Sequence, residues 1–181
     1  MFTVQPRPAT DAGRTTLPRR AMTTSYIEAG CFERMAYVRV HGLGSVRVAE
    51  PLNDFLRKRL TDGYARFVVD LDPCDGMDST FMGVLAGSAL ALARTEGGGV
   101  SVVNFNERCY RQMEELGLTK VLDVRTDPLR CPQIPVKVIA REDAPPAPFP
   151  LPTVKDSHEN LVKANPKNAE KFGPFLKDLP S

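Results

Sequence analysis

The stretch Asp78-Ser79-Thr80-Phe81-Met82-Gly83 ends a strand-like segment, residues 67–72, and opens a long apolar segment, residues 84–93. A serine at such a junction lies where the backbone N–H groups of the first helical turn have no partner and the helix dipole is positive. This position can bind or carry a phosphate. The simpler interpretation is that Asp78 or Ser79 only caps the helix, a role worth about 1 kcal/mol. Whether Ser79 is a switch or a cap therefore decides most of the function.

Apolar spacing on either side of this stretch predicts alternating strands and helices. A period of two or a continuous apolar run indicates a strand, and an i, i+3, i+4 spacing indicates a helix. The expected elements are, in chain order, strands at 25–29 and 33–41, a helix from Ser45 or Glu50 to Asp62-Gly63, a strand at 67–71, the helix that follows Ser79 and ends at Gly97-Gly98-Gly99, a strand at 100–104, a helix at 107–116 capped by Asn106, and a last edge strand or extended arm at 134–140. This order predicts an α/β domain with helices packed on a mixed sheet.

We expect some apolar residues in and around the helix after Ser79 to be buried and others to be partly exposed. Its stripe of apolar residues is most simply core; these are Phe81, Val84, Leu85, Ala89 and Leu92. Met77, Phe81 and Met82 flank the serine motif, and we expect them to be partly exposed as a docking surface.

The two ends of the chain differ from this domain in composition. Residues 1–24 are rich in Pro, Thr and Arg and are predicted to be a disordered tail. We expect the true start to be Met22, with an organelle transit peptide as the alternative. Residues 25–140 form the predicted domain. Residues 141–152 form a Pro-rich linker, with five prolines from Ala144 to Pro152. Residues 153–181 are predicted to be a partly helical C-terminal extension that opens on an Asp156–Glu159 capping box. Its role stays open between folding back on the sheet, dimerisation and contact with another partner.

The composition restricts the class of function. A net charge of +2, with 42% apolar and 25% charged residues, fits a soluble protein with no overall drive toward nucleic acid or membrane. No uncharged apolar run reaches the roughly 18 residues of a membrane helix. The four cysteines, Cys31, Cys74, Cys109 and Cys131, lie far apart with no metal-site spacing, so we expect reduced thiols in a cytoplasmic protein and no metal.

Enzymatic motifs do not account for the serine. A nucleophilic serine needs a base, and the two histidines, His41 and His158, lie in no recognisable hydrolase motif. The aspartates of residues 70–76 miss the spacing of a calcium loop, and Gly97-Gly98-Gly99 lacks the Lys-Ser/Thr of a phosphate loop. The prediction is a protein with no catalytic activity and no cofactor.

Residues 67–124 resemble the STAS domain of bacterial anti-sigma factor antagonists. The resemblance rests on a strand that ends in Asp70, on residues 77–85, which are similar to the family's Asp-Ser-Ser/Thr-Gly-Leu-Gly pattern, and on the closing segment 100–122. With a weaker match from about Thr24, it covers roughly residues 24–125. Phe81 stands where the family usually has Gly, which makes the turn bulkier.

This resemblance implies a mixed sheet with helices on one face and a partner-switching function. It implies binding to an anti-sigma factor serine kinase, phosphorylation of Ser79, with Thr80 as the alternative, and removal of the phosphate by a phosphatase. The implied partner-binding residues are Asp78, Ser79, Thr80, Phe81 and Met82. Phosphorylation would add a charge of about −1.5 to −2 to an already acidic loop, and an unpaired desolvated charge weakens an interface.

Two other hypotheses stay open at this point. One is a STAS-type assembly subunit without phosphorylation, for example in a transporter complex. The other is a nucleotide binder or enzyme on the same fold. The oligomeric state is also left open, a homo-oligomer included.

Overall fold

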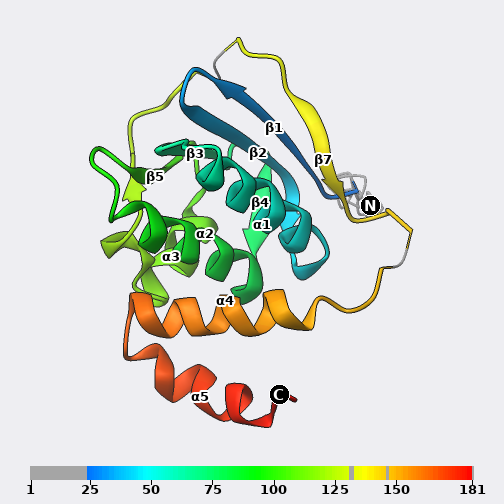
Figure 1. Ribbon diagram of the computed structural model, residues 1–181, viewed down its shortest axis with the longest axis vertical. Helices are drawn as coiled ribbons and strands as arrows, with labels where there is room; N and C mark the ends of the chain where they lie inside the picture. The colour runs from blue at the N-terminus through cyan, green and yellow to red at the C-terminus, as the bar shows by residue number, and fades with distance from the viewer. Residues whose placement is uncertain (1–23, 131–132, 146, 181) are drawn as a thin grey trace, which may run out of the picture.

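The computed structural model describes residues 24–130, 133–145 and 147–180, so the predicted tail of residues 1–24 lies almost wholly outside the described residues, as does Cys131. The chain folds as β1 (Tyr26–Phe32), β2 (Met35–Gly44), α1 (Val46–Thr61), β3 (Arg66–Asp70), β4 (Cys74–Met77), α2 (Ser79–Leu92), β5 (Gly99–Val103), α3 (Glu107–Glu115), the 3₁₀ turn η1 (Leu118–Lys120), β6 (Asp123–Val124), β7 (Lys137–Arg141), α4 (Leu151–Ala164) and α5 (Asn168–Asp178) (Figure 1).

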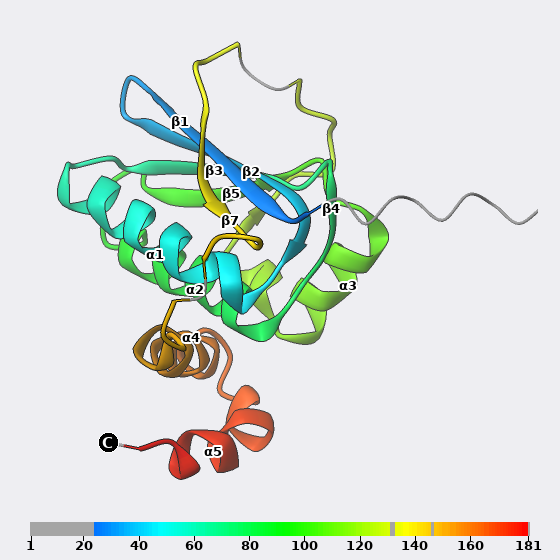
Figure 2. The ribbon, with the colours of Figure 1, turned by 90° about the vertical axis from the view of Figure 1, so that its right-hand side faces the viewer.

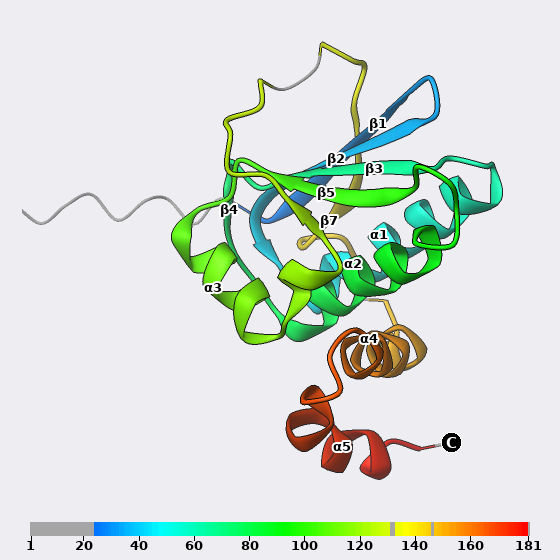
Figure 3. The same ribbon diagram turned by 90° about the vertical axis from the view of Figure 1, so that its left-hand side faces the viewer.

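The strands form one mixed sheet in the order β6-β5-β3-β2-β1-β7, and β4 pairs with β2 off this path. Strands β2, β3, β5 and β6 are mutually parallel, whereas β1 runs antiparallel to both β2 and β7. Helices α1, α2 and α3 cover one face of this sheet (Figures 2 and 3). The predicted fold class, a mixed sheet with helices on one face, is therefore confirmed.

The core lies between the sheet and these three helices. Helix α2 is buried on nearly every side, as its continuous apolar sequence requires, because the sheet, α1 and α4 enclose it. The five residues of its predicted apolar stripe are all buried, at 0 to 3% exposure, so that prediction is confirmed. The alternation of buried and less buried residues along β1 and β3 gives the sheet one core face.

Three local expectations need correction or refinement. The segment between the strand expected at 67–71 and the helix after Ser79, where no strand is expected, contains β4, because backbone pairing with β2 is available there. The segment left open as strand or arm is the edge strand β7, which pairs with β1. The Asp156–Glu159 capping box is wrong: α4 already begins at Leu151, because Pro152 is tolerated in a first turn and Val154 is buried.

The C-terminal extension does not fold back on the sheet. Helix α4 packs against α2 on the side away from the strands, and α5 packs against α4, which adds two further layers below the domain (Figures 1 and 2). Of the helices in the described part of the chain, none combines the length and apolar character needed to cross a membrane.

Candidate functional site

Strand β4 leads directly to the serine motif, and side chains of α3 hold this strand in position. The amide of Gln112 bonds both backbone groups of Met77, with Nε2 donating to the carbonyl (2.8 Å) and Oε1 accepting from the N–H (3.0 Å). Asn106, which caps α3, also donates from Nδ2 to the carbonyl of Cys74 (2.6 Å). These side chains satisfy backbone groups of a short strand that has β2 on one side.

A pair of buried thiols ties the same strand to α3. Cys109 Sγ donates to Cys74 Sγ across 3.9 Å, and both cysteines are free. This hydrogen bond lowers the pKa of the accepting Cys74 thiol, while the same bond and burial raise the pKa of Cys109. Cys109 therefore stays a protonated donor, and the contact adds to the hold on β4.

Asp78 joins the starts of two helices. One carboxylate oxygen accepts from the N–H of Phe81 (2.8 Å), which caps α2, and the other accepts from the N–H of Val46 (2.6 Å), in the first turn of α1. The backbone N–H of Asp78 donates to the carbonyl of Gly44 (2.8 Å). The capping role expected for Asp78 or Ser79 falls to Asp78, which leaves the Ser79 hydroxyl free for other chemistry.

Ser79 is the first residue of α2, and its hydroxyl meets a histidine from the C-terminal extension. Ser79 Oγ lies 2.9 Å from His158 Nε2, and His158 Nδ1 lies 2.7 Å from the carbonyl oxygen of Val154. A carbonyl only accepts, so Nδ1 carries a hydrogen; in the neutral ring Nε2 then accepts from the Ser79 hydroxyl. The side chain of Ser79 is half-buried, and that of His158 is 5% exposed.

The rings of α5 enclose this histidine. Phe172 meets the His158 ring edge-on with centroids 4.9 Å apart, and Phe175 lies tilted against it at 4.7 Å. Sequence reasoning set His158 aside because it lies in no motif. No local signal could have paired it with Ser79, since 79 residues separate them and the contact depends on how α4 packs.

The other predicted site residues lie deeper than expected. Phe81 is fully buried beneath Gly44, where an added Cβ would come 2.9 Å from the ring, and Met77 and Met82 are only 4% and 5% exposed. The expected partial exposure of these three residues is therefore wrong, because the sheet, α1 and the C-terminal helices enclose the start of α2. Thr80 is also buried, at 5% exposure, whereas Asp78 and Ser79 keep part of their surface.

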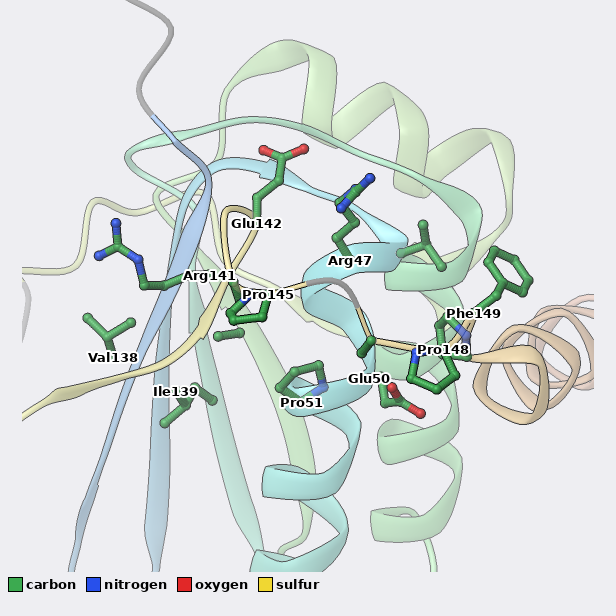
Figure 4. A pocket seen from close by; sticks show the side chains of 15 residues that line it. Arg47, Glu50, Pro51, Val138, Ile139, Arg141, Glu142, Pro145, Pro148 and Phe149 are labelled. Atoms are coloured by element: carbon green, nitrogen blue, oxygen red, sulfur yellow. The ribbon is translucent and has the colours of Figure 1, made fainter.

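Two cavities occur in the described part of the structure, and both lie beside α1. One cavity, of about 630 Å³, lies between the start of α1, strand β7 and residues 144–145 and 147–150, and is lined by charged residues of both signs as well as by prolines (Figure 4). A second, of about 310 Å³, lies between α1, α2 and α4. Neither of these two cavities is lined by Ser79 or His158, although the pair has the hydrogen bond of a nucleophile and base.

A metal site needs several ligating side chains close together. Within residues 24–130, 133–145 and 147–180, no group of three or more His, Cys, Asp or Glu side chains is placed to hold a metal ion.

Comparison with known proteins gives matches of structure alone. No family model matches the sequence, and no curated protein matches it. The chain is similar to an anti-sigma factor antagonist from Mycobacterium paratuberculosis, with 21% identity over 58% of this chain and 86% of that one, at a TM-score of 0.48. It is also similar to the anti-sigma factor antagonist SpoIIAA in its unphosphorylated form, with 14% identity over 56% and 89% of the two chains and a TM-score of 0.48. The phosphorylated form of the Bacillus cell fate determinant SpoIIAA matches with 16% identity over 56% and 92%, at a TM-score of 0.47.

Proposed function

We propose that this chain is a non-enzymatic, cytoplasmic partner-switching regulator of the anti-sigma factor antagonist type, controlled by phosphorylation of Ser79. The observation that carries the proposal is the place of Ser79: it is the first residue of α2, inside the motif at residues 77–85 that resembles the family's phosphorylation segment. Because Asp78 already caps the helix, the Ser79 hydroxyl is not needed to hold the fold's backbone.

The proposed reaction is phosphoryl transfer from ATP by a partner kinase. Ser79 Oγ forms a bond to the γ-phosphorus, the bond from that phosphorus to the bridging oxygen of ADP breaks, and the hydroxyl proton passes to a base of the kinase. A phosphatase reverses the modification by hydrolysis of the phosphate ester. The burial of Thr80 supports Ser79 over Thr80 as the acceptor, because the Ser79 side chain keeps more exposed surface.

The electrostatic consequence explains how a phosphate would end partner binding. It adds about −1.5 to −2 charge beside the Asp78 carboxylate. A partner docked over the start of α2 would have to desolvate both charges, and unpaired desolvated charges weaken an interface strongly. Asp78 and Ser79 are the proposed contact residues, and the buried Thr80, Phe81 and Met82 act by shaping the turn beneath them.

Capture of the partner from host extract tests this function. The full chain, tagged, is used as wild type, Ser79→Ala, Ser79→Asp and the control Thr95→Asp, which adds the same charge at an exposed position beyond the far end of α2. We expect the wild type to capture an anti-sigma serine kinase, and Ser79→Asp to reduce that capture at least about tenfold, equivalent to roughly 1.4 kcal/mol. Thr95→Asp should leave it unchanged. Equal capture by all four proteins would contradict the proposal.

One alternative is favoured by a specific observation, the hydrogen bond between Ser79 and His158. If that bond serves only to fasten the C-terminal extension, the chain is an assembly subunit without phosphorylation. In that case the captured partner would hold no kinase, and Ser79→Asp would change the extension's packing without a phosphorylated counterpart in the host.

A further inference from the structure

Helix α4 lies along the face of α2 that begins with Ser79. Ser79, Gly83 and Gly87 stand four residues apart, so they share one face of α2. Residues of α4 meet all three: His158 bonds Ser79, the backbone of Ser157 lies against Gly83, and the side chain of Asn160 lies against Gly87. Helix α4 therefore already occupies the surface at and beside the proposed switch residue.

The fit between the two helices depends on the missing side chains of the glycines. A Cβ at Gly83 would stand 2.3 Å from the carbonyl oxygen and 2.6 Å from the carbonyl carbon of Ser157, both backbone atoms. A Cβ at Gly87 would stand 2.3 Å from Asn160 Nδ2, the far end of a side chain that can turn away. These glycines therefore let the backbone of α4 come close to α2. A substitution at Gly83 disturbs this contact far more than one at Gly87.

The docked helix is held by a mixed, partly polar contact. The side that α4 buries contains two aliphatic residues, Val154 and Leu161, and three polar ones, Thr153, Ser157 and His158. Its first turn has no side-chain cap, and a 14-residue helix is marginal on its own in water. Exposed residues between β7 and α4, including Pro145 and Pro148, connect it to the domain. Helix α4 therefore depends on docking against α2 for its order. If it is released, the residues between β7 and α4 still connect it to the domain.

Helix α5 strengthens the docked arrangement from outside. Asn168, at its start, donates from Nδ2 to the carbonyls of Leu116 (3.0 Å) and Leu161 (2.8 Å), and so joins the ends of α3 and α4. Phe172 and Phe175 pack on His158. The two C-terminal helices are coupled through the residue that bonds Ser79.

We propose that α4 is an internal competitor for the docking face of α2: it covers Ser79 through His158, and a partner kinase reaches the serine only after α4 leaves. This inference rests on the proposed function and adds the regulation of that site. Phosphoryl transfer replaces the hydrogen that Ser79 donates to His158, so the modification also removes this bond, whichever way the phosphate turns. The closed form is thus the unmodified resting state, and opening of α4 sets how much Ser79 is available.

The test opens α4 in the full chain without altering α2. Leu161 is fully buried and belongs to α4, so Leu161→Asp should release the helix, because an aspartate there would be buried without a partner. Lys163→Ala, on the exposed side of the same helix, is the control: it changes the net charge by the same amount and removes only an exposed ion pair with Glu159. Hydrogen exchange of residues 79–92 and 151–164 measures opening, and mass spectrometry measures the initial rate of Ser79 phosphorylation by host extract with ATP.

We expect Leu161→Asp to raise both the exchange of the first turn of α2 and the rate of Ser79 phosphorylation at least about tenfold, because the apparent rate scales with the open fraction. Lys163→Ala should behave as the wild type. If hydrogen exchange shows that Leu161→Asp opens α4 but Ser79 is phosphorylated no faster than in the wild type, the proposal that α4 covers Ser79 is overturned. The proposed function then still stands. If Ser79 is not phosphorylated even in the opened variant, the proposed function itself fails.

A second pair of variants covers the case in which Leu161→Asp does not fold. Gly83→Ala and Gly87→Ala both remove a helix-interior glycine, which favours the helix to a similar extent in each case. Gly83→Ala meets the backbone of α4 and should open it, whereas Gly87→Ala meets only the amide of Asn160 and should not. Equal exchange of α4 in these two variants would overturn the proposal.

Discussion

At the scale of single residues, Asp78 is the group on which the geometry of the site depends most. Its two carboxylate oxygens serve different helices, since one caps α2 and the other accepts from the first turn of α1. The switch serine follows directly in the chain. The position of Ser79 is therefore set by its neighbour, and a change at Asp78 should affect stability before it affects chemistry.

Asp78→Ala should destabilise the protein by about 1–3 kcal/mol, because it removes a helix cap and leaves two backbone donors without their acceptor. Urea unfolding followed by circular dichroism measures the change. Asp127→Ala, an exposed aspartate, serves as the control and should stay within about 0.5 kcal/mol of the wild type. A loss at Asp78 no larger than that of the control would mean that these two hydrogen bonds do not hold the helix starts together.

At the scale of elements, one amide side chain joins α5 to both α3 and α4. Asn168 links three helices through two buried carbonyls, and both bonds come from one amide nitrogen. The packing of α5 against α3 and α4 therefore depends on a residue far from Ser79 in the sequence.

Asn168→Ala should loosen α4 and α5 more than the domain, because the carbonyls of Leu116 and Leu161 lose a buried donor, at a cost of about 1–3 kcal/mol. Hydrogen exchange should rise in residues 151–178 and stay unchanged in β3 and β5, which lie in the core of the sheet. Glu170→Ala, on the exposed side of α5, should leave both regions as in the wild type. Uniform acceleration over the whole chain would instead indicate that the C-terminal helices unfold only with the domain.

Some helices and contacts could be predicted from the sequence, whereas others depend on tertiary packing. Helix α2, its cap and its buried stripe follow from local signals, namely an aspartate before an apolar run and its spacing. The start of α4 was misplaced, because Pro152 reads as part of a linker until tertiary packing buries Val154. The contact of His158 with Ser79 and the burial of Met82 depend on packing between segments distant in sequence, which no local pattern contains.

At the scale of the whole molecule, the chain consists of a sheet, a first helical layer that carries the proposed switch, and an outer C-terminal pair (Figures 2 and 3). The serine lies at the boundary between the second and third of these layers. Addition of charge at this boundary affects two associations at once: docking of a partner on α2 and docking of α4 on the same face. A chain built in this way links its own closed state to the phosphorylation that we propose.

The most direct test of the account is to map phosphorylation of the chain purified from its host. Residues 67–93 contain no Lys or Arg, so trypsin yields one peptide, Phe67–Arg94, that contains both Ser79 and Thr80, and fragmentation assigns the site. The account predicts phosphate on Ser79 in the wild type, with no phosphate on this peptide in the Ser79→Ala variant expressed in the same host. A peptide that is never phosphorylated on Ser79, under conditions in which the partner kinase is active, would contradict the central claim.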